Sequence, residues 1–443
     1  MNFDLLVKIV KRAEELGADD VVASGDESKS WEVKFVDNRI ATWMSSYEEE
    51  VSLFISKDKR LGLTTIKDLS KKSIEESISK LLRFTRKMQP NPEYNGIAQG
   101  PFKYKPLEGT YDGRIAKLDE RATDFVEAGV NSALAEGAVR ASGVLKYDAG
   151  EDFLVTSNSV EATQRGSGLY FSIRALVDKY ASGHKVCCST TIRDFKPEDA
   201  GARAGRVAKK AVNPVKGEVG SYDIIFDPYP FANLLNIAMD SASIFSVEAG
   251  FSFLGGKLNK KVASREVTLI DDGRMPRCLS SSKFDAEGVP TRRNVVIEKG
   301  VLKTYLHNTS TAKKYGVKTT ANAGLLSPKP WNAVLDKGSY SEKEMFEEVR
   351  RGLYITNIWY TRFQNYEKGD FSTIPRDGIF LIERGEPTKS LKEIRLNDNM
   401  LRMLQNTVAV AKKQEQILGW EVEIPVITPH VLVKGVKVTR PTS

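Results

Sequence analysis

Histidine is scarce in this chain, and its scarcity excludes the commonest zinc motifs. Only three histidines occur among 443 residues, and each is more than a hundred residues from the next: His184, His307 and His430. A local motif with two metal-binding histidines is therefore absent. We expect each histidine to be a hydrogen-bonded structural residue. A metal site assembled from these distant histidines and carboxylates stays open.

The chain also has few cysteines, no long apolar run and only a small net charge. The three cysteines, Cys187, Cys188 and Cys278, are too few for a disulfide framework and fit a reducing compartment. No stretch approaches the roughly 18 apolar residues of a membrane span. The net charge is only +8, and no basic arm suggests nucleic-acid binding. We expect a cytoplasmic protein that contacts neither membrane nor nucleic acid directly.

A helix followed by strands is predicted at the start of the chain. Apolar residues recur at helical spacing from Asn2 to Gly17, and alternating apolar residues then indicate strands that end near Ile66. Helical character returns from Ser70 to Met88. Several prolines follow, and they indicate a linker over 90–111 because proline continues neither a helix nor a central strand.

The same order of elements is predicted again after the linker. A helix, a strand meander and a second helix are expected over 112–136, 139–192 and 197–212. The sequence TTIKDL at 64–69 resembles TTIRDF at 190–195, and each closes a meander. We interpret 1–89 and 112–213 as repeats within an N-terminal region, residues 1–220.

The C-terminal half, residues 221–443, is expected to be a domain rich in antiparallel strands. Apolar residues from Phe231 to Phe245 mark one buried helix, and short strands flank the turn at 298–300. A long helix is expected from about Leu396 to Leu418. Because helices and strands segregate along the chain, the predicted fold class is α+β.

Three local patterns resemble functional motifs without completing them. The segment GFSFLGGK at 250–257 has Leu254 where a nucleophile elbow needs its second glycine, and it has glycine, not lysine, after Gly255, where a phosphate loop needs lysine. Ser280 and Lys283 have the S-x-x-K spacing of some acyl-transfer enzymes, but a loop is favoured. A solvated helix face is predicted for the basic residues Arg203, Arg206 and Lys210.

Five segments of the C-terminal half resemble the TldD/PmbA family, which includes proteins described as modulators of DNA gyrase. In order they are FDAEGVPTRR (284–293), EKGVLKTYL (298–306), GDFS (369–372), IERGEP (382–387) and PHVLV (429–433). The N-terminal layout is also similar, so the resemblance covers essentially the whole chain. It implies a two-part α+β architecture. It also implies a cytoplasmic metalloprotease of TldD-like and PmbA-like (TldE) chains that acts on peptides or unfolded proteins.

The resemblance also shows where this chain departs from an active TldD-like chain. There, an H-E-x-x-x-H motif supplies two zinc ligands and a glutamate base, and a C-terminal cysteine completes the site. The matching segment here begins at Val247, keeps Glu248 and ends at Ser252, and no cysteine follows Cys278. Valine cannot bind a metal, and a serine hydroxyl is a poor zinc ligand. The PmbA/TldE branch, which lacks the metal site, is the better match.

This branch implies a chain without its own metal or cofactor, whose zinc is carried by a TldD-like partner. The expected assembly is a heterodimer with that partner, or a homodimer in its absence, in which this chain is a scaffold that holds polypeptide substrate. No catalytic residue is expected, and the candidate substrate-binding residues are Glu248, Gly250, Gly255 and Gly256. Glu248 could instead be a hydrogen-bonded helix-end residue.

Two other functions stay open. One is an autonomous serine-type hydrolase that uses Ser252 or Ser280, with Lys257 or Lys283 as the activating residue. The other is a regulatory protein that binds DNA gyrase or another DNA-linked protein directly. The sequence ties no histidine or carboxylate to either serine, and its charge pattern gives no support to DNA binding.

Overall fold

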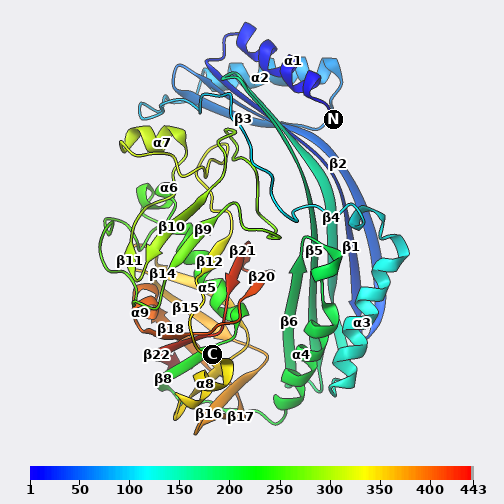
Figure 1. The fold of residues 1–443 in the computed structure, drawn as a ribbon, viewed down its shortest axis with the longest axis vertical. Helices are drawn as coiled ribbons and strands as arrows, with labels where there is room; N and C mark the ends of the chain where they lie inside the picture. The colour runs from blue at the N-terminus through cyan, green and yellow to red at the C-terminus, as the bar shows by residue number, and fades with distance from the viewer. Residues whose placement is uncertain (441–443) are drawn as a thin grey trace.

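A long curved sheet stands beside a C-terminal body that is built on two further sheets, as the computed structural model shows for residues 1–440 (Figure 1). The body lies on the concave side of the curved sheet. Within the described residues, no helix is long and apolar enough to cross a membrane. The mixture of segregated helices and antiparallel strands confirms the predicted α+β class.

The curved sheet has six antiparallel strands in the order β3-β2-β1-β4-β5-β6. Their bounds are Asp20–Val36 (β1), Arg39–Lys57 (β2), Arg60–Ile66 (β3), Arg140–Thr156 (β4), Val160–Leu176 (β5) and Ser182–Ser189 (β6). Two-residue turns at Asp37-Asn38 and Asp58-Lys59 connect β1 to β2 and β2 to β3, and all four residues have positive φ. Asparagine and aspartate tolerate this conformation well, which is why such turns form tight hairpins.

Four helices cover the outer side of the curved sheet, and helix, three strands and helix occur twice in succession. The helices are α1 (Phe3–Glu15), α2 (Lys71–Thr85), α3 (Ala122–Ala135) and α4 (Pro197–Lys210). The amphipathic helix α1 buries Leu6, Ile9 and Val10 against β1 and β4. Helix α3 begins later than the sequence pattern predicts, because two 3-10 turns, Ile115–Lys117 and Asp119–Arg121, precede it.

The C-terminal body combines a six-stranded sheet with a ten-stranded sheet. The smaller contains β9 (Leu269–Asp272), β10 (Arg293–Glu298), β11 (Val301–Leu302), β12 (Ala333–Leu335), β20 (Glu415–Gly419) and β21 (Val422–Thr428). The larger contains β7 (Val215–Lys216), β8 (Gly220–Phe226), β13 (Arg351–Ile355), β14 (Ile358–Asn365), β15 (Asp370–Pro375), β16 (Ile379–Glu383), β17 (Glu386–Lys392), β18 (Arg395–Asn399), β19 (Thr407–Val410) and β22 (Val431–Thr439).

Helix α5 (Pro228–Asp240) forms the centre of the body's hydrophobic core. It is buried on nearly every side and contacts strands of both sheets, and its buried residues include Asn233 and Asn236 among apolar side chains. The other helices of the body are short: α6 (Ile244–Glu248), α7 (Thr309–Lys314), α8 (Glu342–Glu347) and α9 (Met400–Gln405).

The predicted long helix over 396–418 is wrong. Only α9 is helical there, and β18, β19 and β20 occupy the rest of the segment. Met400, Met403 and Leu404 have helical spacing and are buried, but the residues that follow Asn406 pair with β22 instead. Sheet pairing with a distant strand therefore overrides the local helical pattern.

The close approach of α3 and α4 gives a first testable prediction. A Cβ atom on Gly201 would lie 1.9 Å from the carbonyl oxygen of Gly129. We expect Gly201→Ala to lower the free energy of unfolding by about 1–3 kcal/mol, since overpacking outweighs the roughly 1 kcal/mol that alanine gains from helix propensity. Urea unfolding followed by circular dichroism measures the change.

The matched control is Gly166→Ala on β5, where no atom lies within 4 Å of the added Cβ. This variant should stay within roughly 0.5 kcal/mol of the wild type. Equal stability of the two variants would show that the helices can separate without cost.

Candidate functional site

The segment that matches the family's metal motif lies at the end of α6. Val247 and Glu248 are the last residues of this helix, and Gly250 has φ of 74° just beyond it. A left-handed glycine is the usual way to end a helix. The chain then turns back, so Ser252 lies beneath the helix end and not on its exposed face.

Ser252 is a structural residue in this arrangement. Its side chain is buried, and its hydroxyl donates a hydrogen bond to the carbonyl oxygen of Ser241 at 2.6 Å. The same hydroxyl accepts a hydrogen bond from the backbone nitrogen of Leu254 at 3.0 Å. Both roles of the hydroxyl are therefore committed to the backbone, which leaves it neither a nucleophile nor a free metal ligand.

Glu248 is held by a lysine from another helix. Its Oε1 atom lies 2.7 Å from Nζ of Lys314, the last residue of α7, and Lys314 also pairs with Glu93 in the linker. Burial opposes the charge on Lys314, but the two carboxylates raise the pKa of its ammonium group above the ordinary value. Glu248 is thus a paired residue at a helix end.

Glu248 also lines a cavity of about 230 Å³ at the junction of the curved sheet, the linker and the body. Its apolar wall includes Val22, Phe54, Leu61, Ile97, Phe245 and Leu325, and its polar groups include Tyr94, Glu287, Asn308 and Thr311. The cavity is thus lined by apolar and polar side chains together. Glu248 is the one candidate substrate-binding residue that the cavity includes.

Glu287 is the buried acid of this cavity. Burial and the neighbouring Asp285 raise the pKa of the Glu287 carboxyl, which accepts a hydrogen bond from the backbone of Thr309 at 3.3 Å. Asp285 accepts three backbone hydrogen bonds, from Glu287, Val289 and Ala323. Such bonds favour the charged form of Asp285, but burial outweighs them and raises its pKa to about 7. Glu287 lies in the FDAEG stretch, but the sequence pattern did not indicate its role in the cavity.

The three candidate glycines lie outside this cavity. In the described part of the chain, its lining contains none of Gly250, Gly255 and Gly256. Gly250 and Gly256 have positive φ and open space where a side chain would stand, so both are turn residues. The structure does not bring these glycines together with Glu248 around one pocket.

The S-x-x-K pair is not assembled for catalysis. The backbone nitrogen of Ser280 donates to Asn332, and the Lys283 ammonium group donates to the carbonyl oxygen of Thr163 on β5. Over residues 1–440, no hydrogen bond joins Ser280 to Lys283. The segment acts as a loop that contacts the curved sheet.

The three histidines lie in three different places. His184 on β6 contacts Ser172 at 3.0 Å, His307 before α7 contacts Thr311 at 3.3 Å, and His430 before β22 lies 3.5 Å from Asp227. Burial lowers the pKa of His184 and of His307 to about 4 in each case. Across the described chain, no group of three or more His, Cys, Asp or Glu could hold a metal ion.

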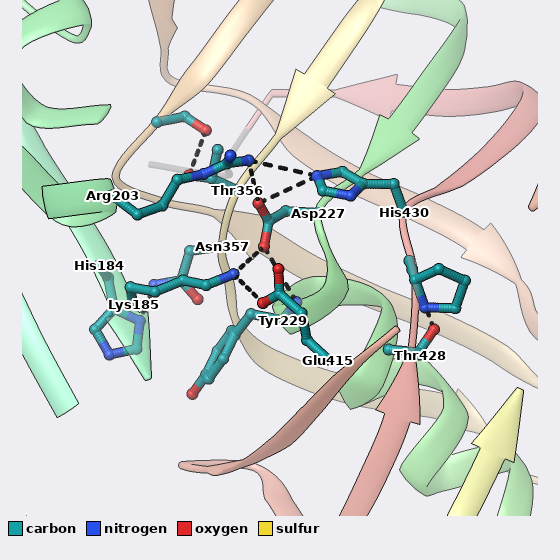
Figure 2. A network of polar contacts seen from close by, with 12 residues as sticks. His184, Lys185, Arg203, Asp227, Tyr229, Thr356, Asn357, Glu415, Thr428 and His430 are labelled. Carbon is teal, nitrogen blue, oxygen red and sulfur yellow. Dashed lines mark hydrogen bonds and ion pairs between the residues drawn. The ribbon is translucent and has the colours of Figure 1, made fainter. Parts of the chain in front are cut away.

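A buried ionic network joins the curved sheet to the body, with Asp227 at its centre (Figure 2). Asp227 follows β8 and lies 3.1 Å from Lys185 on β6 and 3.0 Å from Arg203 on α4. Tyr354 on β13 donates a hydrogen bond to it at 2.9 Å, and Lys185 also pairs with Glu415 at 2.6 Å. Burial alone would raise the pKa of Asp227, but Lys185, His430 and Arg203 hold it well below the ordinary value.

The prediction of a solvated face for Arg203 is wrong. Its guanidinium group belongs to the Asp227 network, whereas Arg206 pairs with Glu136 near the surface. Periodicity places both arginines on one helix but carries no information about what packs over it. The only local signal for the network was Lys185, a charged residue inside the predicted strand meander and directly before Val186, Cys187 and Cys188.

Comparison with known proteins agrees with the fold. The PmbA/TldA metallopeptidase C-terminal domain matches residues 219–440, which places this α+β protein in a class related to metallopeptidases. The chain belongs to the PmbA/TldD family. A protein named metalloprotease from Methanothermobacter thermautotrophicus is 29% identical over 62% of this chain and 61% of its own length.

Two solved structures are similar over essentially the whole chain. A Thermotoga maritima protein, whose name proposes a role as modulator of a DNA gyrase, is 26% identical, with 98% of this chain and 99% of that one covered and a TM-score of 0.87. TldE from Thermococcus kodakarensis is 22% identical, with 98% and 100% covered and a TM-score of 0.88. The second likeness shows that the two chains share one fold.

The Asp227 network generates a prediction about stability. We expect Asp227→Asn to lower the free energy of unfolding by about 3–5 kcal/mol, because it leaves buried positive groups without their shared carboxylate. The control is Glu218→Gln, which breaks the exposed pair with Arg351, whose side chain is 62% exposed. That change should cost less than about 1 kcal/mol. Urea unfolding measures both variants. Equal losses of unfolding free energy in the two would show that the Asp227 network does not stabilise the fold more than an exposed ion pair does.

Buried His184 makes stability depend on pH. Its pKa falls from the ordinary 6.5 to about 4 in the folded protein, so between these values the unfolded chain binds a proton that the folded chain does not. Above pH 6.5 His184 is neutral in both states and costs the folded protein no stability. As pH falls from 6.5 toward 4, protonation of the unfolded chain lowers the free energy of unfolding by up to roughly 3 kcal/mol.

The variant His184→Gln should therefore lose less stability than the wild type between pH 7 and pH 5. The difference between the two urea midpoints at each pH isolates His184, because other titrating groups are common to both proteins. An identical loss in the two proteins would show that His184 does not titrate in this way.

Proposed function

We propose that this chain is a PmbA/TldE-like subunit of a cytoplasmic TldD/TldE-type metalloprotease. In this assignment it pairs with a zinc-bearing TldD-like chain, acts as a scaffold and holds peptides or unfolded proteins for cleavage. The observation that carries the proposal is the motif segment itself. Val247 stands in place of one ligand, and the hydroxyl of Ser252, in place of the other, is committed to the backbone.

The residues at this segment do not fit a zinc ion. A catalytic zinc site needs three protein ligands, usually nitrogen, sulfur or carboxylate oxygen. Val247 offers no donor atom, and the carboxylate of Glu248 is paired with Lys314. We therefore assign no step of peptide hydrolysis to a metal in this chain.

Substrate holding is supported by the cavity beside α6. A space of about 230 Å³ suits one or two side chains of a substrate and not a folded domain. Its lining includes the buried carboxyl of Glu287, whose pKa burial raises, together with the side chains of Asn308 and Tyr94. Such a site can hold polypeptide through backbone and side-chain groups without demanding one sequence.

The serine-type alternative has less support. Neither Ser252 nor Ser280 contacts a histidine or carboxylate among the hydrogen bonds of residues 1–440, and a nucleophilic serine needs an adjacent base. Regulation of DNA gyrase is suggested only by the names of similar proteins, and no feature of the site favours it.

Metal content and activity test the proposal. We expect the purified chain to contain no stoichiometric zinc and to leave unfolded casein uncleaved. Mixing it with a TldD-like chain should give a complex on size-exclusion chromatography and raise the cleavage rate above that of the TldD-like chain alone. Elemental mass spectrometry and a fluorescent casein assay provide the two measurements.

Variants of this chain separate the alternatives. Ser280→Ala should leave the activity of the complex unchanged, and a chelator should abolish that activity. One zinc per isolated chain, or chelator-resistant hydrolysis by the isolated chain that Ser280→Ala or Ser252→Ala abolishes, would overturn the proposal.

A further inference from the structure

Two cavities lie between the concave face of the curved sheet and the body. Their volumes are about 420 Å³ and about 540 Å³. Tyr170, Ser172 and Trp420 line both cavities, so the two form one continuous groove, which we call the Trp420 groove. In the described part of the chain, the groove shares no lining residue with the cavity beside Glu248. It is therefore a separate space.

One wall of the groove is the concave face of β5. Phe171 and Ile173 of this strand lie in the hydrophobic core beneath α3 and α4, and side chains alternate between the two faces of a strand. Tyr170, Ser172 and Arg174 therefore face the body. This wall offers a ring, a hydroxyl group and a guanidinium group at successive positions of one face.

Another wall is the turn between β20 and β21, which carries Trp420. This residue is 73% exposed, the largest value among the exposed large apolar residues of the described chain. Its backbone is nevertheless fixed, because the Tyr229 hydroxyl donates a hydrogen bond to the carbonyl oxygen of Trp420 at 3.2 Å. An indole ring on an anchored turn is thus left open to contact a ligand.

Trp359 adds a ring to the groove from an irregular part of β14. A bulge between Trp359 and Arg362 interrupts the pairing with β15, and Tyr360 within it has φ of 58°. Bulges commonly redirect a side chain, and a bulky residue with positive φ is strained. Such strain is concentrated at binding and active sites. Four tyrosine and tryptophan side chains then line the first cavity: Tyr170, Tyr229, Trp359 and Trp420.

A chain of hydrogen bonds presents one hydroxyl proton to the groove. The side-chain amide of Asn357 donates to Asp377 and lies 3.5 Å from Nδ1 of His184 (Figure 2). Because Nδ1 faces an N–H donor, the proton of the neutral imidazole lies on Nε2, which is 3.0 Å from the Ser172 hydroxyl oxygen. Ser172 accepts that hydrogen bond and keeps its own proton to donate. No imidazole lone pair is left to activate Ser172, so this residue is a hydrogen-bond donor and not a nucleophile.

The charges around the first cavity oppose a cationic ligand. Arg174 pairs with Asp377 at 3.0 Å, and the guanidinium group of Arg376 lies 4.0 Å from the centre of the Trp359 ring. Two positive groups and one carboxylate leave positive charge in excess. The second cavity adds one lysine and one aspartate, which supply no negative excess. Ring faces alone would attract a cation, but this surplus favours a neutral or acidic ligand.

We propose that the Trp420 groove binds an aromatic side chain of an extended polypeptide. Its rings offer faces and edges against which another aromatic ring packs better than an aliphatic side chain. The Ser172 hydroxyl donates to a backbone carbonyl oxygen of the same polypeptide. The second cavity continues the groove along β4 and β5 and gives space to the neighbouring residues of that polypeptide. The inference rests on the proposed function only in taking polypeptide as the ligand.

Peptide binding by the full-length chain tests the groove. The probes are short fluorescein-labelled peptides of glycine and serine with one central phenylalanine, leucine or lysine. Fluorescence anisotropy should show about three- to tenfold tighter binding of the phenylalanine peptide than of the leucine peptide, because an aromatic pair adds that much. The lysine peptide should bind most weakly. Equal affinities for phenylalanine and leucine, or no binding at millimolar peptide, would overturn the proposal.

Variants locate the binding. Trp420→Ala should remove the preference for phenylalanine, whereas Ser172→Ala should weaken the phenylalanine and leucine peptides by a similar factor, because the hydroxyl contacts backbone. The control is Phe84→Ala, which removes an exposed ring from α2 on the outer side of the sheet and should change neither affinity. Circular dichroism checks that each variant is folded. A preference for phenylalanine that survives Trp420→Ala contradicts the assignment to this groove.

Photo-cross-linking of the wild type gives the position without any substitution in the chain. A peptide with benzoylphenylalanine at its centre should form adducts within 168–172 and 418–420, which mass spectrometry identifies. Adducts on α6 or α7 would assign the ring to the cavity beside Glu248 and overturn the inference while the subunit proposal stands. A chain that binds the phenylalanine peptide here but forms no complex with a TldD-like chain would overturn the subunit proposal alone.

Discussion

One buried carboxylate joins the curved sheet to the body at the centre of a network of charged groups. Asp227 forms ion pairs with Lys185 and Arg203 of the N-terminal region and accepts a hydrogen bond from Tyr354 of the body, so one charge connects three elements. A buried ion pair of this kind adds little net stability compared with an apolar contact, but removal of one partner is costly. The cavity beside α6 depends on how the two parts dock, because its walls come from both.

Sequence patterns predicted the elements of the curved sheet well, because each strand there pairs with a neighbour along the chain and has alternating apolar residues. The segment 396–418 failed for the opposite reason. Its short strands pair with β22 and β21, which come later in the sequence, and Met400 to Leu404 give a helical pattern that holds for only six residues. The local spacing of apolar residues indicates which secondary structure a segment prefers, but hydrogen bonding to strands distant in the sequence determines the structure that it adopts.

The site was predicted in part. The altered motif located Val247, Glu248 and Ser252, and the structure places them at one helix end with Glu248 at a cavity wall. Glu287 and Asp227 were missed, because the environment of a buried carboxylate is made by residues far away in the chain. The glycines of 250–256 were misleading for a different reason. A glycine with positive φ is needed in tight turns as well as at binding sites, so its presence in the sequence does not distinguish the two.

The place of β22 has a consequence for how the molecule is made. This strand, the last of the chain, lies between β8 and β18 in the larger sheet, and His430 immediately before it contacts Asp227 immediately after β8. A chain leaving the ribosome can complete the curved sheet early, but the larger sheet of the body lacks β22 until residues 431–439 emerge. During synthesis the concave face of the sheet is thus bare for the whole time that the C-terminal half is translated.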